Sequence, residues 1–257
     1  MMNAASPTVI EESKHKFEEI LNAKRLLDVH VSVTVRPLTP EEAIGSPQRQ
    51  DFPIIEGKER VIEADVLGAK GHAFTDSPRN FSGTMRDVLE LPLTTNQNRG
   101  VFIAVLNAML RHLEEIEGTV HCKNEDPEKC AKEIAGFVWE KRSGVKVGLI
   151  GLNPAIAEAL ISTFGEENVT VSDLNRDNVG KKKYGVTIVD GRDETDTLIE
   201  RSDFVVITGT TLVNGTFDAI MQAIGKLGKD YLVYGVTGSG VCHLQGLNRM
   251  CPYGRDR

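Results

Sequence analysis

The stretch that decides the fold is Asp203-Phe-Val-Val-Ile-Thr-Gly-Thr-Thr-Leu-Val-Asn-Gly-Thr216. Its apolar, β-branched run at 204–207 is typical of a strand buried on both faces of a parallel sheet. The chain then turns polar at the carboxyl end of that strand, where open α/β sheets bind their ligands. A helix expected at 217–227, capped by Asn214 or Thr216, would point its free N–H groups at the same loop. The segment therefore predicts a hydroxyl-lined site for an anionic or carbonyl group, with a ligand-free capped turn as the alternative. The ligand-binding residues expected in this loop are Thr208, Gly209, Thr210, Thr211, Asn214 and Thr216.

The second half of the chain alternates strands with helices at short spacing, which predicts a parallel, doubly wound sheet of the Rossmann-like class. A helix from Asp126 to about Arg142, with Pro127 at its first position, opens this half. The expected strands are 145–150, 169–172, 186–189, 204–207 and 231–234, and the expected helices between them are 154–164, 193–200 and 217–227. The lysines at 181–183 read as a solvated loop.

The first half has strands followed by helices, an α+β pattern. A helical stripe covers 9–27, and Val29, Val31, Val33 and Val35 then alternate with polar residues as in a half-buried strand. A second strand at 61–67 is expected to pair with the first, with Gly68 and Gly71 ending it. Helices follow at about 84–89, capped by Thr84, and at 99–113. Glycine, Asn, Asp and Pro cluster between 118 and 127, which divides the chain into domains at 1–122 and 123–257.

Two further loops carry ligand-binding signals. Gly151 follows the strand at 145–150, and Asn153 can cap the next helix. Asp173 ends the following strand, where Rossmann domains place the acid that accepts from ribose hydroxyls, although the full glycine fingerprint is absent. Gly151 and Asp173 could equally be turn residues. Thr237 lies in a third glycine-rich loop after the strand at 231–234. Because parallel strands end at one edge of a sheet, these loops are predicted to share one small-molecule site.

Composition limits the function classes. The 257 residues are 40% hydrophobic and 26% charged, as in an ordinary globular protein, and the net charge of -7 argues against a nucleic-acid binder. The apolar runs are too short to cross a membrane, and the N-terminus lacks a signal core, so we expect a cytoplasmic protein. Whether copies of the chain form a homo-oligomer stays open.

Cysteine and histidine occur as the adjacent pairs His121-Cys122 and Cys242-His243, with Cys130 and Cys251 nearby. No zinc motif is present, and neighbouring residues on a strand point to opposite faces, so no metal ligands are assigned. The alternative is a non-catalytic carrier of a heavy metal or metallo-ligand that uses Cys122, Cys242, Cys251 and these histidines.

Three segments together resemble the heavy-metal chelation family: the octapeptide at 209–216, Gly235-Val236-Thr237 with 247–252, and the helix around Asn107. The resemblance implies an enolase N-terminal-like α+β domain, a Rossmann-like domain and a site between them. It also implies heavy-metal chelation, or condensation or hydrolysis in the synthesis of pterin-, flavin- or siderophore-like chelators. The Rossmann half looks partly like that of methyltransferases, but Asn153-Pro154 stands where those enzymes have a further glycine, so no cofactor is assigned.

On this basis the site is expected to bind a small molecule or a metal chelate. Asn107, His72 and Asp76 would reach in from the first domain. His72, Asp76 and Asp173 are the candidates for proton transfer if the site is catalytic.

Overall fold

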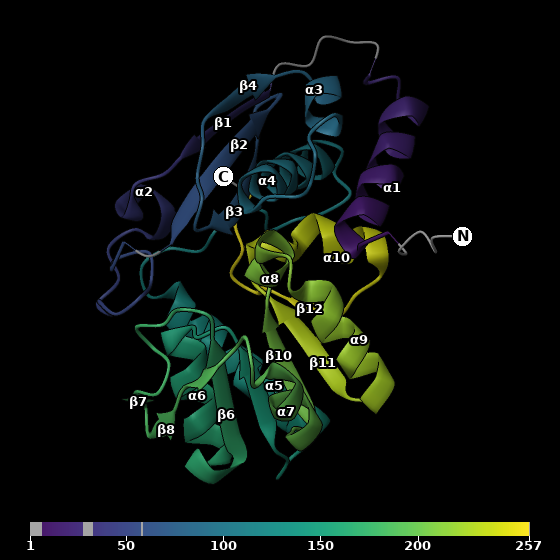
Figure 1. Cartoon of the computed structure of the whole chain (residues 1–257). Coiled ribbons are helices and arrows are strands. Elements are labelled where there is room, and N and C mark those ends of the chain that lie inside the picture. The colour runs from purple at the N-terminus through teal and green to yellow at the C-terminus, as the bar shows by residue number, and fades with distance from the viewer. Residues whose placement is uncertain (1–6, 28–32, 58, 257) are drawn as a thin grey trace.

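A computed structural model describes residues 7–27, 33–57 and 59–256. It contains an antiparallel sheet and a parallel sheet, which lie one above the other in Figure 1. The predicted strand residues Val29 and Val31 lie outside the described residues.

The antiparallel sheet has four strands in the order β3-β2-β1-β4. The strands are β1 (Val33–Pro37), β2 (Arg60–Val66), β3 (Ala69–Thr75) and β4 (Phe81–Gly83). The predicted pairing of the first two strands is confirmed, with Val35 opposite Ala64. Helix α4 (Asn96–His112) packs on β2 and β3, and its residues 100–110 are all buried. This helix is apolar over most of its circumference, so it lies at the centre of the core.

Gly71 was predicted to end the second strand, but it lies within β3. A Cβ atom at Gly71 would stand 2.3 Å from both the carbonyl oxygen of Ala104 and the amide nitrogen of Ala108 on α4. Glycine is present here because a strand and a helix approach each other closely.

Three shorter helices complete this half: α1 (Val9–Ala23), α2 (Pro40–Ile44) and α3 (Met85–Leu89). Each begins with a capping box. The hydroxyl of a threonine at the N-cap accepts a backbone N–H of the first turn, and a carboxylate in that turn accepts the backbone N–H of the threonine. The predicted cap at Thr84 is confirmed, whereas α2 was not predicted, and α1 ends before the predicted residue 27.

The parallel sheet has six strands in the order β12-β11-β10-β5-β6-β9. Read from β9 and numbered along the chain within this sheet, the order is 3-2-1-4-5-6, which is that of dinucleotide-binding Rossmann folds. The strands are β5 (Val147–Ile150), β6 (Val169–Asp173), β9 (Val189–Asp190), β10 (Phe204–Thr208), β11 (Asp230–Tyr234) and β12 (Arg249–Met250). The prediction of a Rossmann-like, doubly wound sheet is confirmed.

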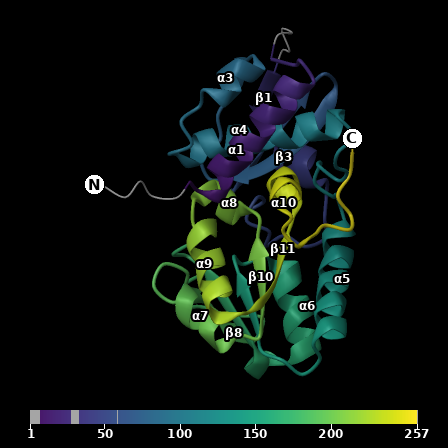
Figure 2. The same cartoon turned by 90° about the vertical axis from the view of Figure 1, so that its right-hand side faces the viewer.

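Helices cover both faces of this sheet, as Figure 2 shows. On one side α5 (Asp126–Lys141) packs against α6 (Pro154–Phe164), and on the other α7 (Thr195–Arg201) packs against α9 (Phe217–Leu227). The Asn153 cap of α6 is confirmed, since its side chain accepts a 3.2 Å hydrogen bond from the amide of Ile156. A short 3-10 helix, η1 (Glu166–Asn168), precedes β6.

The segment before β9 differs from its prediction. The expected single strand at 186–189 is divided between β8 (Val186–Thr187), which pairs antiparallel with β7 (Lys182–Lys183), and β9 in the main sheet. The lysines predicted as a solvated loop therefore form one strand of a small hairpin. Gly185, with a φ of 95°, permits the tight turn between its two strands.

The two polar segments predicted as loops contain helices. Thr210–Asn214 forms α8, and the segment after β11 forms a 3-10 helix, η2 (Val236–Gly238), followed by α10 (Ser239–Gln245). Thr216 precedes α9 without a side-chain capping bond, and Asn214 accepts from Thr216 instead of from the helix. The predicted capping of α9 by either side chain was therefore wrong.

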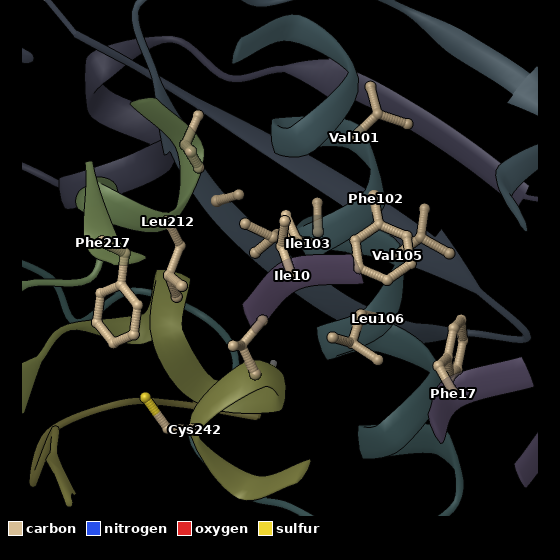
Figure 3. Close-up of a cluster of buried hydrophobic side chains, with 14 of the residues drawn as sticks. Ile10, Phe17, Val101, Phe102, Ile103, Val105, Leu106, Leu212, Phe217 and Cys242 are labelled. Carbon is tan, nitrogen blue, oxygen red and sulfur yellow. The ribbon is translucent and has the colours of Figure 1, made fainter. Parts of the chain in front are cut away.

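Helix α10 joins the two sheets, because it packs on α1 and α4 of the upper layer. The resulting core contains Phe17 and Phe102, whose rings meet edge to face at 6.2 Å, together with Leu212, Phe217 and Cys242 (Figure 3). One core therefore contains residues from both halves. The division at 122/123 stays a prediction.

No helix among the described residues combines the length and the apolar character needed to cross a membrane.

Candidate functional site

A cavity of about 1000 Å³ lies at the carboxyl ends of β5, β6, β10 and β11. These strands flank the point where the order of the parallel sheet reverses, which is where ligands bind in open α/β folds. The other wall of the cavity comes from the upper layer, which contains the antiparallel sheet. Lining residues from that layer are Pro53, Glu59, Phe74, Thr75, Asp76 and Asn96. The predicted convergence of several strand ends on one cavity is thus present in the structure.

Gly151 makes the tight turn after β5 with a φ of 87°. A Cβ atom there would stand 2.5 Å from Cγ2 of Thr208, so glycine lets the ends of β5 and β10 approach. The carbonyl oxygen of Gly151 accepts a 3.1 Å hydrogen bond from the hydroxyl of Tyr234. Gly151, Asn153 and Thr208 all line the cavity.

Asp173 lines the cavity and also stabilises the Gly151 turn. One carboxylate oxygen accepts a 2.8 Å bond from the amide of Leu152, and the other accepts a 2.6 Å bond from the amide of Asn175. The two readings of Asp173, as a turn residue and as a site residue, are therefore compatible.

The threonine-rich segment after β10 also reaches the cavity. The hydroxyls of Thr208 and Thr210 lie 3.0 Å apart, whereas the hydroxyl of Thr211 donates to the carbonyl of Thr208 at 2.7 Å. The Asn214 side-chain oxygen accepts from the amide and the hydroxyl of Thr216, at 3.0 and 2.8 Å. Within the described chain the Asn214 amide group donates no hydrogen bond, so its two N–H groups are available to a ligand. Gly209, Thr210, Thr211, Asn214 and Thr216 all line the cavity.

Thr237 lines the cavity with its side chain already engaged. Its hydroxyl oxygen accepts a 3.1 Å bond from the amide of Phe74, which joins η2 to β3. Asp76 also lines the cavity, and both of its oxygens accept from the side chain of Asn96, at 3.0 and 3.1 Å.

Asn107 and His72 do not line the cavity, in contrast to the expectation that they reach into it. His72 is buried between β2 and the segment after α4: its Nε2 lies 3.1 Å from Glu63, and its Nδ1 accepts from the amide of His121. Desolvation is the largest cause of the lowered pKa of His72, with the Glu63 carboxylate acting in the opposite direction. Asn107 is fully buried in α4 and bonds to backbone groups of β3, η2 and α10.

Sequence reasoning missed two cavity residues, Glu59 and Tyr234, and considered a third, His121, only as a metal ligand. Burial, followed by the charges of Asp173 and Asp76, raises the pKa of Glu59 to about 7. Burial also raises the pKa of Tyr234, and desolvation lowers that of His121 to about 4. The Nδ1 atom of His121 is buried without a hydrogen-bond partner among the described residues. No local motif marks Glu59 or Tyr234, since each is one polar residue at the end of a strand.

Three thiols, those of Cys122, Cys130 and Cys251, line the cavity together with His121, whereas Cys242 lies on α10 with its side chain buried in the core. Burial raises the pKa of all four thiols, to about 12 for Cys130 and Cys242. Among residues 7–27, 33–57 and 59–256, no group of three His, Cys, Asp or Glu side chains is arranged to hold one metal ion.

Comparison with known proteins finds one matching family model. The family model DUF364, described as "Putative heavy-metal chelation", matches residues 135–240. No curated protein matches the chain.

Two solved structures from the DUF364 family, both of proteins of unknown function, have a similar fold. The one from Pyrococcus horikoshii is 13% identical with a TM-score of 0.51, over 90% of this chain and 80% of its own. The one from Desulfitobacterium hafniense DCB-2 is 10% identical with a TM-score of 0.50, over 92% of this chain and 84% of its own. Residues 135–240 of the chain are thus similar to the DUF364 family, and the fold of the chain is similar to that of two DUF364 proteins.

Proposed function

We propose that the chain binds a small, polar, ring-containing organic ligand, either a metal chelate or a chelator during its synthesis, between its two sheets. The observation that carries this proposal is the cavity of about 1000 Å³ at the reversal point of the parallel sheet. Pockets that hold drug-sized ligands enclose about 300 to 1,000 Å³. A chelate or a heteroaromatic ring fits a space of that size better than a bare ion does.

The wall has two chemically different parts, which suits a ligand with several functional groups. The side formed by Thr210 and Asn214 offers hydroxyl and amide donors for an anionic or carbonyl group. The side formed by Glu59, Asp76 and Asp173 offers acceptors. If the site is catalytic, Asp76, Asp173 and Glu59 are the cavity residues that could exchange a proton with the ligand.

The thiols on the cavity wall support a second candidate function, a carrier of a heavy metal or metallo-ligand. Cys122, Cys130 and Cys251 provide soft sulfur ligands, and His121 has an imidazole nitrogen without a partner among the described residues. A carrier of this kind should lose its metal when the thiols are alkylated. A protein that binds an organic ligand through Thr210 and Asn214 should tolerate Cys122→Ser and Cys251→Ser.

Native mass spectrometry of the purified protein tests the main proposal by identifying any copurifying small molecule. Calorimetry with that molecule should show binding to the wild type and at least a tenfold loss in the double variant Thr210→Val with Asn214→Ala. The matched control is Thr187→Val with Asn22→Ala, which changes exposed residues on β8 and α1 and should leave binding unchanged. Unchanged affinity in the first double variant, with its circular dichroism intact, would refute the assignment.

A further inference from the structure

We propose that the wall formed by Glu59, Asp76 and Asp173 recognises a cationic nitrogen group of the ligand, an amidinium, guanidinium or protonated amino-heterocycle, with Glu59 accepting its N–H groups. This inference rests on the proposed function, because it assigns the chemical class that the same cavity selects. Two adjacent N–H groups on a planar cation match the two oxygens of one carboxylate.

The charges of the lining residues favour a cation. Acidic side chains on the wall are Glu59, Asp76, Asp173, Asp193 and Asp196. The basic residue among the lining residues, Arg192, is paired with Asp190 at 3.2 Å and donates to the carbonyl of Leu174 at 2.6 Å. His121 is neutral at neutral pH, because desolvation lowers its pKa to about 4. The lining residues therefore include more acidic than basic side chains, which favours a cation in the cavity.

Among the three carboxyl groups of this wall, Glu59 is the one that accepts no hydrogen bond within the described residues. Asp173 accepts from the amides of Leu152 and Asn175, and both oxygens of Asp76 accept from Asn96. The Glu59 carboxyl accepts no hydrogen bond from the residues that the structure describes. A carboxylate in this position is stabilised by a donor that comes with the ligand.

Ser172 provides an independent sign that a polar ligand belongs here. This residue precedes Asp173 in β6, lines the cavity and is 1% exposed. Its hydroxyl has no hydrogen-bond partner among the described residues. Buried polar groups in folded proteins usually have a partner, so an unpartnered hydroxyl on a cavity wall marks a place for a polar group from outside the chain.

The proton on Glu59 links binding to pH. The groups whose charges act on Glu59 are Asp173 on β6 and Asp76, which follows β3. The charge of Glu59 in turn helps to raise the pKa of Tyr234 on β11. Burial and the two aspartates raise the pKa of Glu59 to about 7, so near neutral pH the group is partly protonated. A bound cation favours the carboxylate and lowers this pKa again. Binding of a cation should therefore strengthen as the pH rises through about 7.

The test uses three probes of the same shape and different charge: benzamidine, benzamide and benzoate. Calorimetry with the full chain at pH 8 should show benzamidine binding about 10- to 100-fold more tightly than benzamide, with benzoate weakest. The amide NMR signals of Gly151 and Gly209 should shift, which places the probe in the cavity. Glu59→Gln should remove most of the preference for benzamidine and its dependence on pH. The control Glu41→Gln, at an exposed residue of α2, should change neither.

The outcomes separate this inference from the proposed function. Binding of benzamide or benzoate in the cavity at least as tightly as benzamidine would overturn the inference and leave the cavity as a ligand site. An undiminished preference for benzamidine in Glu59→Gln would do the same. If Mg²⁺ binds in a Glu59-dependent way and benzamidine has no preference, the wall selects an inorganic cation and the inference is wrong. If no probe binds and no small molecule copurifies, both proposals fail.

Discussion

The side-chain oxygen of Asn107 accepts a 2.7 Å hydrogen bond from the backbone N–H of Gly240, so that the middle of α4 is joined to the first turn of α10. The Asn107 amide group also donates to the carbonyls of His72 and Val236, at 3.0 and 3.1 Å. One buried side chain thus satisfies backbone groups of β3, η2 and α10. Asn107 connects the two sheets that form the cavity and does not contact the cavity itself.

Asn107→Ala should therefore destabilise the protein by about 2 to 4 kcal/mol, because three buried backbone groups lose their partner. Urea unfolding followed by circular dichroism measures this change. Asn22→Ala, at an exposed position of α1, is the control and should stay within about 0.5 kcal/mol of the wild type. A cost below about 1 kcal/mol for Asn107→Ala would contradict this role.

Gly71→Ala should be destabilising by about 2 to 3 kcal/mol, because the added methyl group would stand 2.3 Å from backbone atoms of α4. Gly136→Ala provides the opposite control, since Gly136 lies in α5 and no described heavy atom comes within 4 Å of a Cβ built there. That substitution should stabilise the protein by about 0.5 to 1 kcal/mol through helix propensity. Thermal unfolding of both variants measures the contrast, and equal effects would show that the close approach of β3 to α4 is wrong.

Glu59→Gln should raise stability at pH 8 and have little effect at pH 4. The pKa of Glu59 is raised to about 7 in the fold, above its ordinary value of 4.5. The folded state therefore holds a proton that the unfolded state has released between these values, and wild-type stability falls as the pH rises through this window. Glutamine removes that loss, which amounts to at most about 3 kcal/mol. Urea unfolding of both proteins at several pH values tests the sign, and a gain confined to low pH would refute it.

The four cysteines should react slowly with a disulfide reagent in the native protein and fully after unfolding in guanidinium chloride. Burial raises the pKa of each thiol, so little reactive thiolate exists at neutral pH. Ser162→Cys, at an exposed position of α6, is the control and should add one rapidly reacting thiol. Rapid native reaction of Cys122 or Cys251 in the wild-type protein would contradict the burial of the cavity thiols.

Much of the Rossmann-like half could be predicted because its signals are local. The apolar run at 204–207 forms β10, Asn153 caps α6, and Pro127 lies in the first turn of α5, as the sequence indicated. The convergence of Gly151, Asp173, Thr208 and Thr237 on one cavity also followed from the sequence, because parallel strands end at the same edge.

The errors arose where neighbours distant in sequence decide the structure. Gly71 resembled a strand terminator, but glycine is needed there because α4 approaches β3 closely. The segments at 210–214 and 239–245 resembled loops, but they form α8 and α10, which pack against α4. His72 resembled a proton-transfer residue, but Glu63 and the amide of His121 occupy both of its nitrogens.

The sequence by itself determined the order of strands and helices in the second half and the edge of the sheet at which a ligand would bind. Hydrophobic period, capping residues and glycine turns act over a few residues, so they can be read without the fold. Only the tertiary structure decided that Glu59 faces Asp76 and Asp173 and that Asn107 joins the layers. Those relationships depend on burial and electrostatic contacts between segments far apart in the chain, which no local pattern encodes.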